Sequence, residues 1–77
     1  MQMSFEKIVA DIFNITQESV IDSLSLSDIH SWDSMAHMLF IVRLEEFYQV
    51  QFTGDEIANA LTVGDTRAAL LAHGASL

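Results

Sequence analysis

No proline interrupts this 77-residue chain, and only three of its residues are glycine. Runs of good helix formers therefore continue unbroken, and apolar residues recur within them every three or four positions, as on one face of a helix. Hydrophobic residues make up 51% of the sequence, which is enough apolar material for the core of a small domain. The sequence predicts a single all-α domain over residues 1–77.

Cap residues divide this domain into helices. Ser4 is a candidate N-cap, Thr62 and Asp65 form a capping-box pattern, and Gly74 is a natural stop. We expect a small four-helix bundle with three main helices plus one short helix. The predicted elements are a helix from Ser4 to about Asn14, a second over 34–49, a short one over 55–60, and a last one between Thr62 and Gly74. Inward-facing positions are Phe5, Ile8, Val9 and Ile12 in the first helix and Val63, Ala69 and Leu70 in the last.

A long loop separates the first two helices, over residues 15–32. Because it is longer than most helix–helix connections, we expect its own apolar side chains to pin it to the core. Its acidic residues Asp22 and Asp28 do not make a calcium loop, since the D-x-[DN]-x-[DN]-G pattern is absent. The predicted pins are Val20, Ile21, Leu24, Leu26, Ile29 and Trp32.

The second helix has two apolar stripes where a bundle helix needs one. The stripe predicted to face the core contains His37, Ile41, Leu44 and Tyr48, supported by Phe40. The other stripe contains Met35, Leu39 and Val42 and ends at Glu46, on nearly the opposite face. Either the helix is enclosed on all sides or the second stripe is a binding surface. The adjacent acidic residues Glu45 and Glu46 argue against enclosure and favour a stripe that faces a partner.

The net charge of the chain limits the classes of partner that it can bind. Eleven acidic residues against three basic ones give a formal net charge of −8. Nucleic acid is a poor partner for such a surface, and an anionic membrane is little better. No stretch approaches ~20 apolar residues, and the first residues do not resemble a signal peptide, so we expect no membrane insertion. The absence of cysteine suits a cytoplasmic protein, and the net charge fits a monomer. The acidity either supports docking onto basic patches of other proteins or serves solubility alone.

Ser34 is the candidate for chemistry. It follows Asp33, a good N-cap, at the start of the second helix, where free N–H groups and the helix dipole favour a phosphate. Participation in the cap is the commoner explanation for such a serine. A hydrolase is not expected, because Gly-x-Ser-x-Gly is absent and His37 has no evident orienting acid. The three histidines, His30, His37 and His73, are scattered, so no metal site is predicted.

An ordered set of short motifs begins at Asp33, and the match that it belongs to spans nearly the whole chain, including the long loop between the first two helices. These motifs are Asp33-Ser34-Met35, Leu44-Glu45-Glu46, Phe52, Glu56-Ile57 and Thr62-Val63-Gly64-Asp65. In this order and spacing the sequence resembles the acyl carrier protein family. The resemblance implies that Ser34 receives 4′-phosphopantetheine from coenzyme A, that Asp33 orients the serine, and that Met35 contacts partner enzymes. It implies a non-enzymatic carrier of acyl thioesters, with Asp33 binding metal only together with the transferase.

By the same resemblance, partners dock on the second helix. The implied contact residues are Met35, Leu39, Val42, Glu45 and Glu46. The implied partners are a phosphopantetheinyl transferase and acyl-activating, acyltransferase or synthase enzymes with basic docking patches. The alternatives are an aminoacyl or peptidyl carrier and, in another class, an unmodified acidic helical adaptor or inhibitor.

Several residues depart from carriers of primary fatty acid synthesis. Ala36 and Leu39 stand where acidic residues are usual, Trp32 where a small residue often precedes Asp-Ser, and Thr66 where a larger apolar residue is common. Arg43 adds a positive charge to the implied docking face. We interpret these departures as the mark of a discrete carrier of a dedicated pathway, such as polyketide, hybrid peptide, lipid-modification or polysaccharide-linked acyl transfer.

Overall fold

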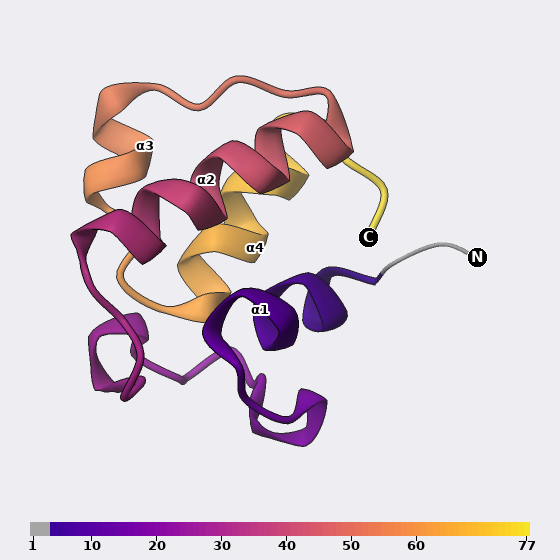
Figure 1. Cartoon of the computed structure of the whole chain (residues 1–77). Helices are drawn as coiled ribbons and strands as arrows, with labels where there is room; N and C mark the ends of the chain where they lie inside the picture. Colours follow the sequence, from indigo (N-terminus) through magenta and orange to yellow (C-terminus); the bar gives the residue numbers. More distant parts are fainter. Residues whose placement is uncertain (1–3) are drawn as a thin grey trace.

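The computed structural model describes residues 4–77 and shows a small helical bundle (Figure 1). Within this range no strand forms, so the all-α prediction is confirmed. Three helices are long and one is short, in the predicted order. The helices are α1 (Phe5–Phe13), α2 (Ser34–Tyr48), α3 (Gly54–Ala58) and α4 (Val63–Ala72), with 3₁₀ turns at Gln17–Ser19 and Leu26–Asp28.

Local capping sets most helix ends. Ser4 Oγ accepts a hydrogen bond from the Lys7 N–H at 3.1 Å, which confirms the predicted start of α1. Thr62 and Asp65 form the predicted capping box at α4, and Gly74 has the left-handed φ of +83° expected just after a helix. The short helix begins earlier than predicted, because a second capping box, formed by Thr53 and Glu56, starts it at Gly54.

The core lies between the helices and takes in part of the predicted inner stripe of α2, since His37 and Tyr48 are only half-buried. Phe40, Ile41 and Leu44 are buried, and the rings of Phe13 and Phe40 meet edge to face with centroids 5.4 Å apart. Each such side chain contributes roughly 1.5–3 kcal/mol through removal of apolar surface from water. The core comprises Phe5, Ile8, Val9, Ala10, Phe13, Val20, Leu26, Ile29, Phe40, Ile41, Leu44, Phe52, Ala60, Val63 and Leu70.

The long loop is tied to the start of α4 by backbone hydrogen bonds. Leu26 N–H donates to the Leu61 carbonyl at 2.9 Å, and Val63 N–H donates to the Leu24 carbonyl at 3.0 Å. The predicted pins Val20, Leu26 and Ile29 are buried, while Leu24 and Trp32 are half-buried against the core. The prediction for Ile21 was wrong, since its side chain is 56% exposed. Val20 takes the inward position, and its neighbour along non-helical backbone faces away from the core.

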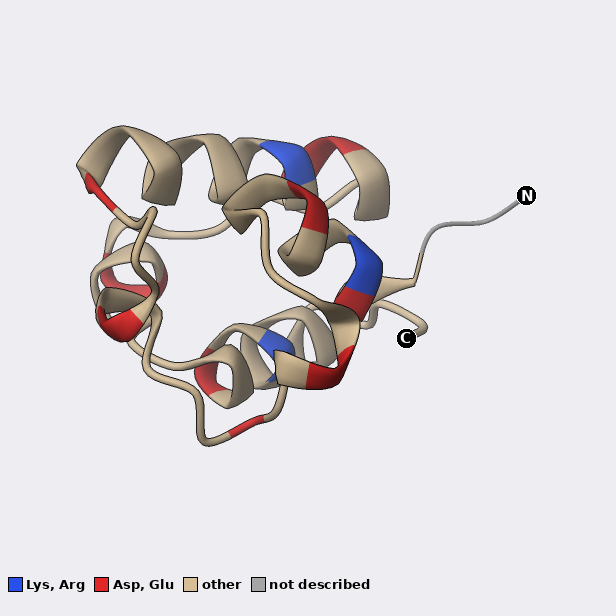
Figure 2. Ribbon diagram, turned by 60° about the horizontal axis from the view of Figure 1, so that its bottom comes forward, with Lys and Arg blue, Asp and Glu red and all other residues tan. Residues whose placement is uncertain are grey.

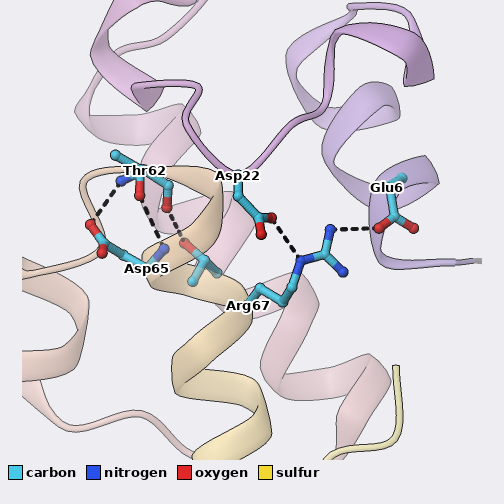
Figure 3. A network of polar contacts seen from close by, with 6 residues as sticks. Glu6, Asp22, Thr62, Asp65 and Arg67 are labelled. Atoms are coloured by element: carbon cyan, nitrogen blue, oxygen red, sulfur yellow. Dashed lines mark hydrogen bonds and ion pairs between the residues drawn. The ribbon is translucent and has the colours of Figure 1, made fainter.

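Arg67 joins α4 to α1 and to the loop (Figure 3). Its Nη2 lies 2.6 Å from Glu6 Oε2, its Nε lies 2.9 Å from Asp22 Oδ1, and its guanidinium stacks over the Phe5 ring at 4.7 Å. The hydrogen bond from Arg67 is the main reason why the pKa of Glu6 lies below its ordinary value of 4.5. We call this group of four residues the Arg67 clasp.

Candidate functional site at the start of α2

Asp33 forms the N-cap of α2, as predicted. Its φ of −152° is extended, its Oδ1 accepts the Ala36 N–H at 2.7 Å, and its carbonyl accepts the His37 N–H at 2.9 Å. The Asp33 side chain thus satisfies one of the donors that a helix start leaves unpaired, and its carbonyl accepts the first regular hydrogen bond of the helix. The capping role that sequence chemistry offered to Ser34 belongs to its neighbour.

Ser34 is the first residue of α2, and its side chain is exposed. Over residues 4–77, no hydrogen bond involves its hydroxyl or takes the N–H of Ser34 or Met35. These groups lie at the positive end of a 15-residue helix, where an anion is favoured by about 0.3–1 kcal/mol. The site therefore presents an accessible hydroxyl beside free backbone donors, and the fold makes no use of either.

The second apolar stripe of α2 lies in solvent. Met35 is 83% exposed and Leu39 50%, and Val42 and Met38 are also exposed. Sequence reasoning missed Met38, although its spacing of three residues from Met35 and four from Val42 was the signal for it. We call these four side chains the outer face of α2.

Acidic residues lie at both ends of this helix, with Asp33 at its start and Glu45 and Glu46 in its last turn (Figure 2). Glu46 is exposed beside the outer face. Glu45 is only half-exposed, because its Oε2 accepts the Phe52 N–H at 2.8 Å and so holds the connection to α3. Arg43, exposed on the same helix, interrupts the negative charge.

A pocket of about 440 Å³ opens beside the start of α2. Two of its lining residues, Trp32 and His37, flank Ser34 in the sequence, and their rings meet edge to face with centroids 6.0 Å apart. His37 Nε2 lies 3.2 Å from the Ile57 carbonyl, which links α2 to α3. The remaining wall is formed by Ser25, Leu26, Ser27, Ile57, Ala58, Ala60 and Leu61.

The short helix α3 forms one wall of this pocket and is itself held at two points. Besides the His37 contact, His73 Nε2 at the end of α4 lies 2.9 Å from Glu56 Oε1. The pKa of Glu56 lies below 4.5, first because its carboxylate accepts the Thr53 N–H and second because of His73. Sequence reasoning placed none of these contacts, since His73 and Glu56 are 17 residues apart.

No protein-family model and no curated protein matches this sequence. In the part of the chain that the structure describes, no three His, Asp or Glu side chains gather as metal ligands. The helices of that part are all too short or too polar to cross a bilayer. An assignment of function therefore depends on the chemistry of the residues themselves.

Proposed function

We propose that the protein is an acyl carrier protein that holds acyl intermediates as thioesters on 4′-phosphopantetheine attached to Ser34. The observation that carries this proposal is the exposed, unpaired Ser34 hydroxyl at the start of a helix that another residue caps. A serine needed for the cap would be engaged with the backbone, whereas this one is free to be modified. The ordered motifs that resemble the carrier family converge on the same residue.

The residues at this site fit the prosthetic group. A phosphodiester on Ser34 would lie at a helix start with two free N–H groups, which stabilise negative charge there. Asp33 keeps Oδ2 available to orient the serine while Oδ1 holds the cap. The group would supply a thiol, which this cysteine-free chain lacks, and a thioester is a good acyl donor.

The outer face of α2 fits transient docking to partner enzymes. The apolar side chains of this face lie in solvent next to Ser34, on a protein of net charge −8. They match the surface of a partner enzyme that is apolar at its centre and basic around it. Electrostatic attraction speeds encounter, and a small contact area permits rapid release. A phosphopantetheinyl transferase and the acyl-activating, acyltransferase or synthase enzymes of a dedicated pathway are the proposed partners.

The test is modification of the intact protein. Incubation of the wild type with coenzyme A and a broad-specificity phosphopantetheinyl transferase should add the mass of one prosthetic group. Ser34→Ala should abolish the addition, and Ser27→Ala, a change at an exposed serine of the preceding loop, should leave it intact. A folded wild type that stays unmodified with several transferases would contradict the proposal.

The chemical class of the cargo distinguishes an acyl carrier from an aminoacyl or peptidyl carrier. An aminoacyl or peptidyl carrier would use the same serine, so the two are separated by which activating enzyme loads the thiol. Loading by an acyl-activating enzyme and refusal by amino-acid-activating enzymes is the expected result. The reverse pattern would identify a peptidyl carrier.

The outer face also favours a second candidate, an unmodified acidic adaptor or inhibitor. Its apolar side chains and the surrounding acidic charge require no modification in order to cover a basic enzyme site. This candidate predicts tight binding to one partner that survives Ser34→Ala. Weak binding to several enzymes would count against it.

A further inference from the structure

Two buried polar atoms of the pocket beside α2 have no partner. Over residues 4–77, Trp32 Nε1 and His37 Nδ1 are the buried side-chain nitrogens that make no hydrogen bond. Their rings are neighbours in the pocket wall, with centroids 6.0 Å apart. An unpaired buried donor or acceptor is unfavourable, so native proteins leave few of them, and each one calls for an explanation.

The chemistry of each atom is fixed by its surroundings. An indole N–H can only donate a hydrogen bond. The Ile57 carbonyl can only accept, so His37 Nε2, at 3.2 Å from it, carries the ring proton. In the neutral ring this leaves Nδ1 as an acceptor. Two neighbouring residues of the pocket lining thus carry one unmet donor and one unmet acceptor.

The other polar side chains of the lining do not meet this need. Ser25 Oγ and Ser27 Oγ lie 3.2 Å apart and hydrogen-bond to each other. The remaining wall is apolar, from Leu26, Ile57 and Ala60 among others. A fully saturated chain would fill such a pocket and leave both nitrogens unpaired. A hydroxyl can accept a hydrogen bond from an indole N–H and donate one to an imidazole nitrogen, so it has the chemistry that both atoms lack.

We infer that this pocket selects acyl groups that carry a hydroxyl on the chain, with Trp32 Nε1 and His37 Nδ1 as its specificity-determining atoms. The inference rests on the proposed function, because it takes the ligand to be the cargo of Ser34. Trp32 precedes Ser34 by two residues and His37 follows it by three, so the pocket lies beside the tether.

The first arm of the test needs no prosthetic group. The ¹⁵N-labelled protein is titrated with S-butyryl- and S-(3-hydroxybutyryl)-N-acetylcysteamine, small thioesters that differ by the hydroxyl alone. Amide signals over 57–61 should shift with both. The hydroxylated thioester should bind about five- to tenfold more tightly. It alone should move the indole N–H signal, which is unambiguous because the chain has a single tryptophan.

Two variants separate the hydroxyl contacts from general polarity. Trp32→Phe keeps an aromatic ring without the N–H and should bring the two dissociation constants within twofold of each other. Ser27→Ala, the matched control, changes another polar lining residue and should keep the preference. Equal affinities in the wild type, or a preference that persists in Trp32→Phe, would overturn the inference.

The second arm of the test compares three loaded forms of the protein. They carry the bare prosthetic group, its butyryl thioester and its 3-hydroxybutyryl thioester. Only the hydroxylated cargo should move the indole N–H signal. If the bare prosthetic group already moves the indole N–H signal relative to the unmodified protein, the amides of that group occupy the two nitrogens and the inference is wrong. Failure to load, with the preference kept for the free thioesters, would refute the carrier proposal and leave the pocket's selectivity standing. Loading without any preference would refute the selectivity alone.

Discussion

The Arg67 clasp and the start of α2 use their polar groups in opposite ways. At the clasp, one guanidinium pairs with two carboxylates from segments 45 and 61 residues away and stacks on an aromatic ring. At the start of α2, the Ser34 hydroxyl and two ring nitrogens beside it have no partner within residues 4–77. The first region holds the chain together, whereas the second keeps chemistry that the fold does not require. This contrast is what points to function in the second region.

The largest expected effect contrasts the two faces of α2. Leu44 is fully buried and Leu39 is half-exposed, so the same change tests both faces. Leu44→Ala should lower the free energy of unfolding by about 2–5 kcal/mol, since it opens a cavity in the core. Leu39→Ala should cost less than about 1 kcal/mol, because its face has no packing partner. Urea unfolding followed by circular dichroism measures both, and similar losses would mean that the outer face is part of the fold.

A smaller effect is expected where the loop meets α4. A Cβ on Gly64 would lie 3.0 Å from the Asp22 carbonyl oxygen, whereas a Cβ on Gly54 meets nothing within 4 Å. Gly64→Ala should therefore destabilise the protein by roughly 1 kcal/mol through overpacking. Gly54→Ala should be neutral or stabilise by up to about 1 kcal/mol through backbone entropy. Thermal unfolding of the two variants gives the sign of each change in stability. Stabilisation by both substitutions would show that the loop at Asp22 can shift at little cost to admit the added Cβ.

The clasp itself should be sensitive to acid. Because the folded-state pKa of Glu6 is depressed, its stabilisation is fully present above about pH 4.5 and is lost as the pH falls through the folded pKa. Arg67→Met should cost about 1 kcal/mol at pH 7, and the difference from wild type should shrink below pH 4.5. Lys7→Met removes the same charge from an exposed pair 3.4 Å long and should cost less. A constant difference between wild type and Arg67→Met at all pH values would assign the effect to packing on Phe5.

The smallest effect concerns charge as a whole. At a net charge of −8, self-repulsion should make added salt stabilising near neutral pH, although salt also weakens the clasp. Raising NaCl from 20 to 300 mM should increase the melting temperature by roughly 2 °C, a few tenths of a kcal/mol. A decrease would show that the ion pairs of Arg67 outweigh the repulsion.

Local signals in the sequence predicted the local structure well. Ser4, Asp33 and Thr62 cap the helices that they were expected to cap, because a cap depends on residues within three positions. The Thr53–Glu56 box has an equally visible Thr-x-x-Glu pattern, although the short helix was predicted to begin only at residue 55. Ile21 was misplaced because a loop without regular periodicity does not indicate which of two adjacent apolar residues faces inward.

Contacts between distant segments could not be predicted. Nothing in the sequence indicates that Arg67 meets Glu6 and Asp22, or that Leu26 pairs with Leu61, since these depend on how the loop folds back. At the site, the cap and the exposed stripe followed from spacing alone. The pocket could not be predicted from spacing, because Trp32 and His37 line a common pocket only where α3 packs beside them.

The central claim is that Ser34 serves attachment and not the fold. One variant, Ser34→Ala, tests both halves when its intact mass after incubation with coenzyme A and transferase and its melting temperature are measured on the same preparation. We predict no added prosthetic group and a free energy of unfolding within about 0.5 kcal/mol of the wild type, which itself gains one group. A variant that still gains the group, or one that melts well below the wild type, would contradict the claim.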